Sequence, residues 1–410
     1  NPKFESPNID QLASESLDFE QAYIACPTCS PSRATLLTGL HPVRLKMVRH
    51  IPTTPNKRGF DAFGRTEKEF DIIGSDPARF PCRNWLPLEY TTYAEVLKEL
   101  GYYNLFVGKW HLGHEPYHPI RQGFDRQIGV SNWGHPNSYH PPYFKNSEVQ
   151  SDRYLTDHLT DEAVEFIDTY DKPQPFMLSL WYYSVHAPHE GREDLVKHFQ
   201  EKGIPGARAH YAAMVKAVDE SIGRVRAALD EKGIAENTIV VFLSDQGGYF
   251  ENPPFHGGKR ADTLYEGGAR VPLMVLWPGV TEPGAKNSSI VQSTDLFPTL
   301  IDIAGGDSSK YEADGISLLS TIRTNCILKR SEPIFGYRAY EDLYASVRLG
   351  DWKLLAHRSG AFKLYNIAED IKEENDLSAS QPRKTEELLE KLIEWEKAMG
   401  VEEYSGAPSK

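Results

Sequence analysis

Residues 211–245 read YAAMVKAVDESIGRVRAALDEKGIAENTIVVFLSD, and this stretch decides the fold class. Its first half places apolar side chains at helical spacing on one stripe, namely Tyr211, Met214, Val215, Val218, Ile222, Val225 and Leu229. Gly233 ends the predicted helix, and the apolar run from Ile239 to Leu243 is typical of a buried strand. Asp245 follows directly, so the pattern predicts a helix, a strand and a carboxylate at the carboxyl end of that strand.

The same alternation continues on both sides of this stretch. Further strands are predicted over residues 19–24, 103–107, 176–182 and 271–277, and further helices over residues 9–17, 31–37 and 93–100. Such alternation predicts an α/β fold, with a large mixed, mainly parallel sheet that has helices on both faces. In open α/β sheets, ligands bind at the carboxyl ends of the strands, so we expect the functional site at that edge.

After Gly305-Gly306 the pattern changes to short strands over residues 344–349, 352–356 and 362–365. A terminal helix follows, and its predicted inner face carries Leu388, Leu389, Leu392, Ile393 and Met399. We therefore expect two domains, a catalytic α/β domain over residues 1–310 and a C-terminal subdomain over residues 311–410. The second is predicted to be a small antiparallel sheet covered by a helix.

Composition excludes several classes of protein. The 410 residues are 40% hydrophobic, enough for a large core, which excludes a disordered chain. Forty-five basic and 58 acidic residues give a net charge of −13, the wrong sign for a surface that binds nucleic acid throughout. No apolar run reaches the roughly 18 residues of a membrane span. We expect no nucleic-acid partner and no membrane span, and the four cysteines are too few and too scattered for a disulfide framework.

The most specific string is CSPSRATLLTG, residues 29–39. It places Cys29, a candidate nucleophile, at the start of a helix with Pro31 in the first turn, where backbone N–H groups can bind an anion. Arg33 is placed to hold that anion. Two other interpretations stay open at this point: Cys26 and Cys29 form a redox pair or half a zinc site, or Cys29 is a buried, inert cysteine. No second C-x-x-C occurs, which disfavours zinc.

Cys-x-Pro-Ser-Arg followed by Thr-Gly resembles the signature of the type I, formylglycine-dependent sulfatases of the alkaline-phosphatase-like superfamily. Further motifs agree with the family in the same order: GKWHLG at 108–113, VHAP at 185–188, SDQGG at 244–248, GGK at 257–259, LYEGGARVP at 264–272 and DLFPT at 295–299. The resemblance covers roughly residues 6–366, because its motifs are spread over that range.

The resemblance implies a hydrolase that cleaves sulfate esters, with a sulfated carbohydrate as the expected substrate. Cys29 would be converted to formylglycine by a formylglycine-generating maturation enzyme, and the hydrated aldehyde would attack sulfur. His111 matches the base that serves this diol, whereas His186 and Lys259 match residues that flank the leaving oxygen, one of them as general acid. Lys109, Arg33 and a bound Ca²⁺ would offset the charge on the sulfuryl oxygens.

Asp245 is the clearest candidate metal ligand, because a carboxylate after a buried strand suits a hard cation such as Ca²⁺. Gln246 is the second candidate, although the family more often has asparagine there. The family also has a strand that ends in a pair of aspartates, two further calcium ligands, and that strand would precede Asn1. We expect it to belong to a part of the protein that lies before this sequence.

Substrate recognition is less defined. The candidates for contacts with sugar hydroxyls or carboxylates are His50, His114, His135 and Arg338. Residues 133–143 are rich in rings that could stack on sugars, but a proline-stiffened loop whose rings pack locally accounts for them equally well. By resemblance, we expect the protein to work in the periplasm or outside the cell.

Two alternatives to the sulfatase hypothesis remain. Relatives of the same fold use the Cys-x-Pro-Ser-Arg nucleophile on phosphorus, which gives a phosphonate monoester or phosphodiester hydrolase. The aspartate pair absent from this sequence leaves a non-catalytic binder of sulfated glycans as the other alternative. Single lysines or histidines in loops are most often merely solvated, so only the whole set supports catalysis.

Overall fold

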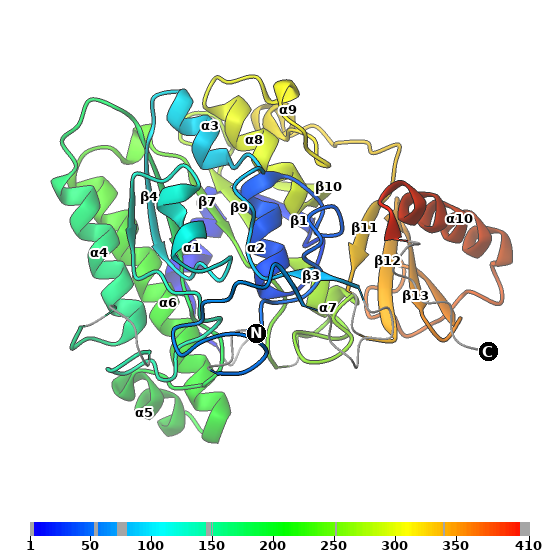
Figure 1. Ribbon diagram of the computed structural model, residues 1–410, viewed down its shortest axis with the longest axis horizontal. Helices are drawn as coiled ribbons and strands as arrows, with labels where there is room; N and C mark the ends of the chain where they lie inside the picture. Colours follow the sequence, from blue (N-terminus) through cyan, green and yellow to red (C-terminus); the bar gives the residue numbers. More distant parts are fainter. Residues whose placement is uncertain are drawn as a thin grey trace.

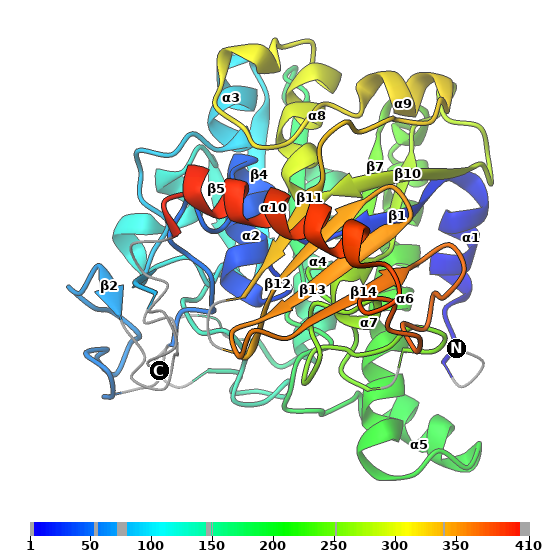
Figure 2. The ribbon, with the colours of Figure 1, turned by 90° about the vertical axis from the view of Figure 1, so that its right-hand side faces the viewer.

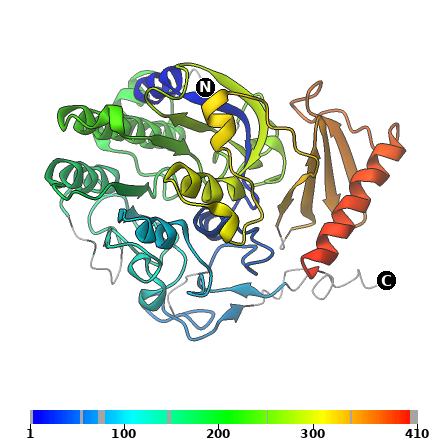
Figure 3. The ribbon, with the colours of Figure 1, turned by 90° about the horizontal axis from the view of Figure 1, so that it is seen from above.

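The computed structural model describes residues 4–52, 56–71, 80–144, 149, 151–250, 252–338 and 341–401. A larger α/β unit lies beside a small sheet that one helix covers (Figures 1 and 3). The first unit runs from α1 (Pro7–Glu15) to α9 (Leu319–Thr324), and the second from β11 (Ile334–Tyr337) to α10 (Pro382–Ala398). In the described ranges, no helix has both the length and the apolar character that crossing a membrane requires.

The first sheet of the larger unit is mixed. Its order is β10 (Lys286–Gln292), β1 (Leu17–Tyr23), β9 (Leu273–Leu276) and β7 (Val240–Leu243), and β8 (Arg270–Val271) also pairs with β1. β10 runs parallel to β1, whereas β8 and β9 run antiparallel to it. Pro272 has no N–H and separates β8 from β9, which splits the predicted strand 271–277. Leu17, predicted to end a helix, instead begins β1.

The second sheet is parallel, with β4 (Tyr103–Gly108) between β5 (Arg126–Ile128) and β6 (Phe176–Trp181). Successive residues of β4 face opposite sides, as strand geometry requires. Leu105 and Val107 pack in a core with α4 (Leu155–Thr169) and α6 (Gly206–Glu231). Phe106 packs in another core with α2 (Cys29–Thr38), α3 (Tyr93–Glu99) and α8 (Leu296–Ile303). Helices therefore cover both faces, as predicted.

The predicted single large sheet is divided in two among the described residues. β6 and β7 are edge strands, as are β5 and β10, because each is hydrogen-bonded to one neighbouring strand within those residues. All residues of β7, and all of β6 except Ser179, are only partly buried. The sequence pattern could not show the division into two sheets or the partial exposure of β6 and β7. An apolar run predicts a buried strand and does not indicate which strands pair.

The remaining elements of this unit are short. The helices are α5 (Glu193–Glu201) and α7 (Glu266–Ala269), and the strands β2 (Phe70–Asp71) and β3 (Cys82–Arg83) form a small antiparallel pair. Single 3₁₀ turns are η1 (Glu115–Tyr117), η2 (Pro119–Arg121), η3 (Ala235–Asn237), η4 (Ser293–Asp295) and η5 (Ser308–Lys310).

The C-terminal sheet is antiparallel throughout, in the order β11, β12 (Leu343–Leu349), β13 (Trp352–His357) and β14 (Phe362–Asn366). The helix α10 lies across it (Figure 2), and its Leu388 and Leu392 are fully buried. Ile393 was predicted on the same face but is 50% exposed. Successive side chains are rotated by about 100° around a helix axis, so Ile393, next to the buried Leu392, points away from the sheet.

A buried ionic cluster joins the two units. Lys353 Nζ of β13 lies 2.8 Å from Oε1 of Glu266, in the larger unit, and 2.9 Å from Oε1 of Glu373. The Tyr23 hydroxyl donates to Oε2 of Glu266 at 2.8 Å. Burial opposes the charged forms, but Lys353 outweighs it at Glu266 and keeps the pKa of that carboxyl below its usual value. The domain boundary after residue 310 remains a prediction. Leu318 and Ile322, which follow that position, pack in one core with β1 of the larger unit.

Candidate active site

Cys29 is the first residue of α2 and follows the turn that leaves β1. Thr28 precedes it in an extended conformation, and every residue of α2 is buried. The Cys29 side chain therefore stands at a helix N-terminus, where the N–H groups of the first turn carry partial positive charge. This agrees with the predicted position of the nucleophile and differs from the predicted helix start at residue 31 by two residues.

Two lysines and two histidines surround the Cys29 thiol. Burial would raise the pKa of this thiol, but the charges of Lys109 and Lys259 and hydrogen bonds with His111 and His186 hold it well below its usual range. Lys109 follows β4 directly, is 2% exposed, and burial lowers its pKa to about 8. The site thus concentrates positive charge in a protein whose net charge is −13.

Lys259 reaches the site because its loop folds back. Its backbone N–H donates to the carbonyl oxygen of Gly248 at 2.9 Å. This hydrogen bond joins the turn at residues 257–259 to the segment just after β7. Gly257 in this loop has a φ of 76°, a left-handed conformation that favours glycine.

His111 is held in a defined orientation. Its Nε2 lies 2.9 Å from the carbonyl oxygen of Ile51, which can only accept, so Nε2 carries the proton in the neutral ring. Nδ1 is buried, and burial keeps the pKa of this imidazole below its usual value, although a hydrogen bond with the Cys29 thiol opposes that shift. His111 has a φ of 56°, a left-handed conformation that costs about 1–3 kcal/mol in a non-glycine residue. It is thus an unprotonated acceptor beside Cys29.

Gly134 makes room for the His111 ring. A Cβ atom at position 134 would lie 2.5 Å from Cε1 and 2.9 Å from Nδ1 of His111, closer than atoms can approach. Sequence reasoning treated this glycine only as part of a ring-rich stretch. Gly134 lies between two large side chains, Trp133 and His135, and a glycine in such a place can indicate that another side chain packs against the backbone.

His186 follows β6, and its Nδ1 lies 2.6 Å from the carbonyl oxygen of Ala187. The His135 ring stacks on it, with 5.2 Å between ring centroids and 6° between planes. Burial is the main cause that lowers the pKa of His186 to about 4, and Lys109 and Lys259 add to it. His186 is therefore neutral near pH 7.

Arg33 and Asp245 connect the ends of three elements. Nη1 of Arg33 donates to the carbonyl oxygen of Lys109 at 2.7 Å, and Nη2 lies 2.9 Å from Oδ2 of Asp245. The guanidinium stacks 5.1 Å from the ring centroid of Trp181, the last residue of β6. Burial would raise the pKa of Asp245, but Arg33 reverses this and keeps it below its usual value. Trp181 was not a predicted site residue, because a strand pattern does not show which helix faces its last side chain.

Gln246 contacts both sides of the site. In one orientation of its amide, Nε2 lies 3.5 Å from Sγ of Cys29. In the other, its oxygen accepts from Nζ of Lys259 at 3.2 Å and its nitrogen donates to the carbonyl of Pro27 at 3.3 Å. The second orientation satisfies both amide groups, so Gln246 orients Lys259.

The predicted calcium ligands are present only in part. Asp245 and Gln246 supply one carboxylate and one amide oxygen, whereas Ca²⁺ takes about six to eight oxygen ligands. Over the described ranges, no group of three or more His, Cys, Asp or Glu side chains is placed to hold a metal ion. These residues therefore do not form a calcium site by themselves.

The four predicted substrate residues divide into two groups. His135 is exposed above His186, and the exposed His50 is close enough for electrostatic interaction with Cys29 and His111. Arg338 also interacts with His50, but it is buried and paired with Glu341 at 3.0 Å. The structure places His114 elsewhere, in contact with the rings of Trp85 and Tyr117.

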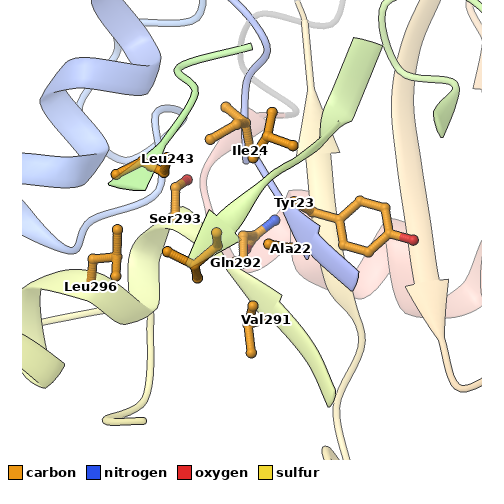
Figure 4. A pocket seen from close by; sticks show the side chains of 10 residues that line it. Ala22, Tyr23, Ile24, Leu243, Val291, Gln292, Ser293 and Leu296 are labelled. Carbon is orange, nitrogen blue, oxygen red and sulfur yellow. The ribbon is translucent and has the colours of Figure 1, made fainter. Parts of the chain in front are cut away.

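A small pocket also lies between the strand ends of β1, β7 and β10 (Figure 4). Its lining is mainly apolar and includes Ile24, Leu243, Val291 and Leu296, with Ser293 among the few polar groups. None of the charged residues around Cys29 lines it, so this pocket is separate from the site.

Comparison with known proteins adds to this geometry. Residues 1–306 match the family described as Sulfatase, and residues 256–398 match the one described as N-sulphoglucosamine sulphohydrolase, C-terminal. The N-acetylgalactosamine-6-sulfatase of Mus musculus is 33% identical over 380 residues, 86% of this chain and 67% of that protein. Arylsulfatase J of Mus musculus is 28% identical over 466 residues, 96% of this chain and 72% of that protein.

Solved structures share the fold. The crystal structure of Ps i-CgsB in complex with k-i-k-neocarrahexaose has a TM-score of 0.81 and 29% sequence identity, and the match covers 98% of this chain and 88% of that one. The structure of Ps i-CgsB without that ligand has a TM-score of 0.83, over 99% of this chain and 89% of that one. These neighbours have the α/β arrangement together with the C-terminal unit, since the matches span nearly the whole chain.

Proposed function

The chain belongs to the sulfatase family, and from this premise we propose that it is a carbohydrate sulfatase whose nucleophile is made from Cys29. It is a sulfuric ester hydrolase, as its relatives are. The observation that carries the proposal is the position of Cys29 at a helix N-terminus, with Lys109, Lys259, His111 and His186 around it. The proposal of a carbohydrate substrate rests on a relative named N-acetylgalactosamine-6-sulfatase and on a neighbour in complex with k-i-k-neocarrahexaose.

Formylglycine at position 29 fits the groups around it. The modified residue supplies, in its hydrated form, a hydroxyl nucleophile in place of the thiol. Nδ1 of His111, which is buried and unprotonated in the neutral ring, is an acceptor suited to such a hydroxyl. Cys29 is 6% exposed and the whole of α2 is buried, so the maturation enzyme would have to act before this region folds.

Each surrounding residue has a role that its environment supports. The ammonium of Lys109 and the N-terminus of α2 stabilise negative charge on the sulfuryl oxygens. Arg33 fixes the position of Lys109 by holding its carbonyl oxygen, and Asp245 fixes Arg33 in turn. The arrangement is rigid before substrate binds, so little reorganisation is needed during the reaction.

Protonation of the leaving oxygen is assigned to Lys259. His186, with a pKa of about 4, holds a proton in only about 0.1% of molecules at pH 7. Since Nδ1 donates to the carbonyl oxygen of Ala187, the neutral ring presents Nε2 as an acceptor, so His186 is not the main acid. Lys259, oriented by Gln246, is the remaining donor near the site.

Calcium stays a prediction from the resemblance, because the two described oxygen ligands do not form a site. Asp245 and Gln246 would be two of its ligands. No catalytic step is assigned to the ion. A periplasmic or extracellular location likewise remains a proposal.

The experiment begins with protein made together with a formylglycine-generating enzyme. Trypsin releases residues 4–33 as one peptide, and its mass distinguishes an aldehyde from a thiol at position 29. We expect the aldehyde, together with sulfate release from 4-nitrophenyl sulfate at a higher rate than hydrolysis of a matched aryl phosphodiester. A retained thiol would refute the nucleophile, and a faster phosphodiester reaction would favour the phosphorus-directed alternative.

A further inference from the structure

Arg260 stands next to Lys259 in the loop that follows β7, and its side chain is exposed. Its guanidinium lies 5.2 Å from the centroid of the Tyr249 ring, in a cation–π contact. The His189 ring meets Tyr249 edge to face at 4.3 Å between centroids. Phe250 and Tyr211 complete this aromatic cluster, with 5.0 Å between their ring centroids. The cation–π contact joins Arg260 to this cluster, and the residue remains exposed to solvent.

The cluster lies directly beside the reacting centre. His189 is half-buried, and after burial the charges of Lys259 and Arg260 are the main causes that lower its pKa. Lys259 also acts on the Cys29 thiol and on His186. Lys259 thus faces the nucleophile, and Arg260, one residue further on, faces the adjoining surface.

Arg260 differs from the other arginines near the site. Arg33, Arg49 and Arg338 are buried and have carboxylate partners, Asp245, Asp71 and Glu341, at 2.9, 3.2 and 3.0 Å. Within the described part of the chain, Arg260 has no carboxylate within 4.0 Å, and the nearby Asp262 is paired with His256. A positioned guanidinium without an acidic partner is suited to bind an anion from outside.

We propose that Arg260, held by Tyr249 and His189, binds a second anionic group of the substrate, on the sugar next to the one that carries the reacting sulfate. The anion is a sulfate ester or a carboxylate, because both accept paired hydrogen bonds from guanidinium. This deepens the proposed function and rests on it, since it defines the substrate as a polyanionic glycan of at least two sugars. A net charge of −13 would repel such a polymer elsewhere on the surface, which gives the local cation more effect.

The test uses three disaccharides that share one sulfate and differ on the neighbouring sugar, which carries a second sulfate, a carboxylate or only hydroxyls. Each is measured as an inhibitor of 4-nitrophenyl sulfate hydrolysis by the matured wild type, Arg260→Gln and Arg383→Gln. Arg383 is exposed on α10, in the other unit, and is the matched control (Figure 1). Direct binding of the same sugars to Cys29→Ala gives a second readout that does not need turnover.

We expect wild type and Arg383→Gln to prefer the second anionic group by about tenfold or more, and Arg260→Gln to lose that preference. Whether sulfate or carboxylate is preferred identifies the anion. Equal binding of all three sugars by the wild type, or an unchanged preference in Arg260→Gln, would overturn the proposal. If 4-nitrophenyl sulfate is not hydrolysed, the proposed function fails, while the binding data for Cys29→Ala still decide the role of Arg260.

Discussion

Arg33 and Asp245 form an ion pair inside the site, with 2.9 Å between Nη2 and Oδ2. The same guanidinium donates to the carbonyl oxygen of Lys109, so one side chain connects α2, the end of β4 and the end of β7. α2 carries the nucleophile Cys29, and the other two segments carry Lys109 and Gln246 beside it. The geometry of the charged groups therefore depends on this pair.

Replacing Arg33 by Met should destabilise the fold, because Asp245 would keep its charge in a largely buried place without a partner. We expect a loss of about 3 kcal/mol in the free energy of unfolding, at the lower end of the range for broken buried pairs. Urea unfolding followed by fluorescence measures it, with Arg383→Met as the control. Equal stability of the two variants would show that the pair contributes nothing.

His111 is predicted to be the base, whereas His114 lies in a different environment. His111→Asn should lower kcat by about 10²–10⁴-fold, the usual contribution of general-base catalysis. His114→Asn should stay within about twofold of the wild type, because His114 contacts Trp85 and Tyr117 rather than the site. Both variants must carry formylglycine for the comparison. Similar losses in both would contradict the assignment of His111.

Gly134→Ala tests the space that the His111 ring needs. A methyl group would overlap the imidazole, so the ring must move away from Cys29 and lose its bond to Ile51. We expect kcat to fall by about 10²-fold with little change in the pH of half-maximal activity. The crystal structure of the variant should show a displaced ring, and an unmoved ring with normal kcat would exclude this role.

The pH dependence should follow Lys109, whose pKa of about 8 means that it is charged below that pH and neutral above it. Its charged fraction falls from about 90% at pH 7 to about 10% at pH 9. Since the charge stabilises the sulfuryl oxygens, kcat/KM should decrease above pH 8. The decrease should move to higher pH in Lys109→Arg, whose side chain does not deprotonate in this range.

Lys259 and His186 can be distinguished through the leaving group. A sugar alkoxide needs a proton, whereas 4-nitrophenolate leaves without one. Lys259→Met should therefore slow hydrolysis of a sugar sulfate much more than hydrolysis of 4-nitrophenyl sulfate. His186→Gln should slow both to a similar extent, and the opposite pattern would make His186 the acid.

Lys353, whose ammonium bridges carboxylates of the two units, should contribute strongly to the free energy of unfolding. Lys353→Met leaves Glu373 buried without its cation and leaves Glu266 with Arg270 alone, 3.3 Å away, which should cost about 3 kcal/mol in the free energy of unfolding. Adding Glu266→Gln and Glu373→Gln to it should recover part of the loss. Lys310→Met is the control, because its pair with Asp307 is exposed to solvent and should contribute little to the free energy of unfolding. A loss equal to that of the control would refute the role of the cluster.

The sequence predicted the α/β class, the C-terminal sheet with its helix, and the convergence of Cys29, Lys109, His111, His186 and Lys259, because periodicity and family motifs report local structure. It did not predict β10, whose sequence KNSSIVQ is largely polar, or the antiparallel direction of β9. Pairing depends on distant residues that no local pattern encodes. The same holds for Trp181 under Arg33 and for Gly134 beside His111, contacts between segments far apart in the chain.

The open edges at β6 and β7 have a consequence for handling the protein. Among the described residues each of these strands has a hydrogen-bonded neighbour on one side only, and its apolar side chains are partly exposed, a combination that promotes strand addition between molecules. Self-association that grows with protein concentration is therefore expected for this stretch of chain, most of all while it is folding. A partner strand that covered either edge would remove that template for aggregation.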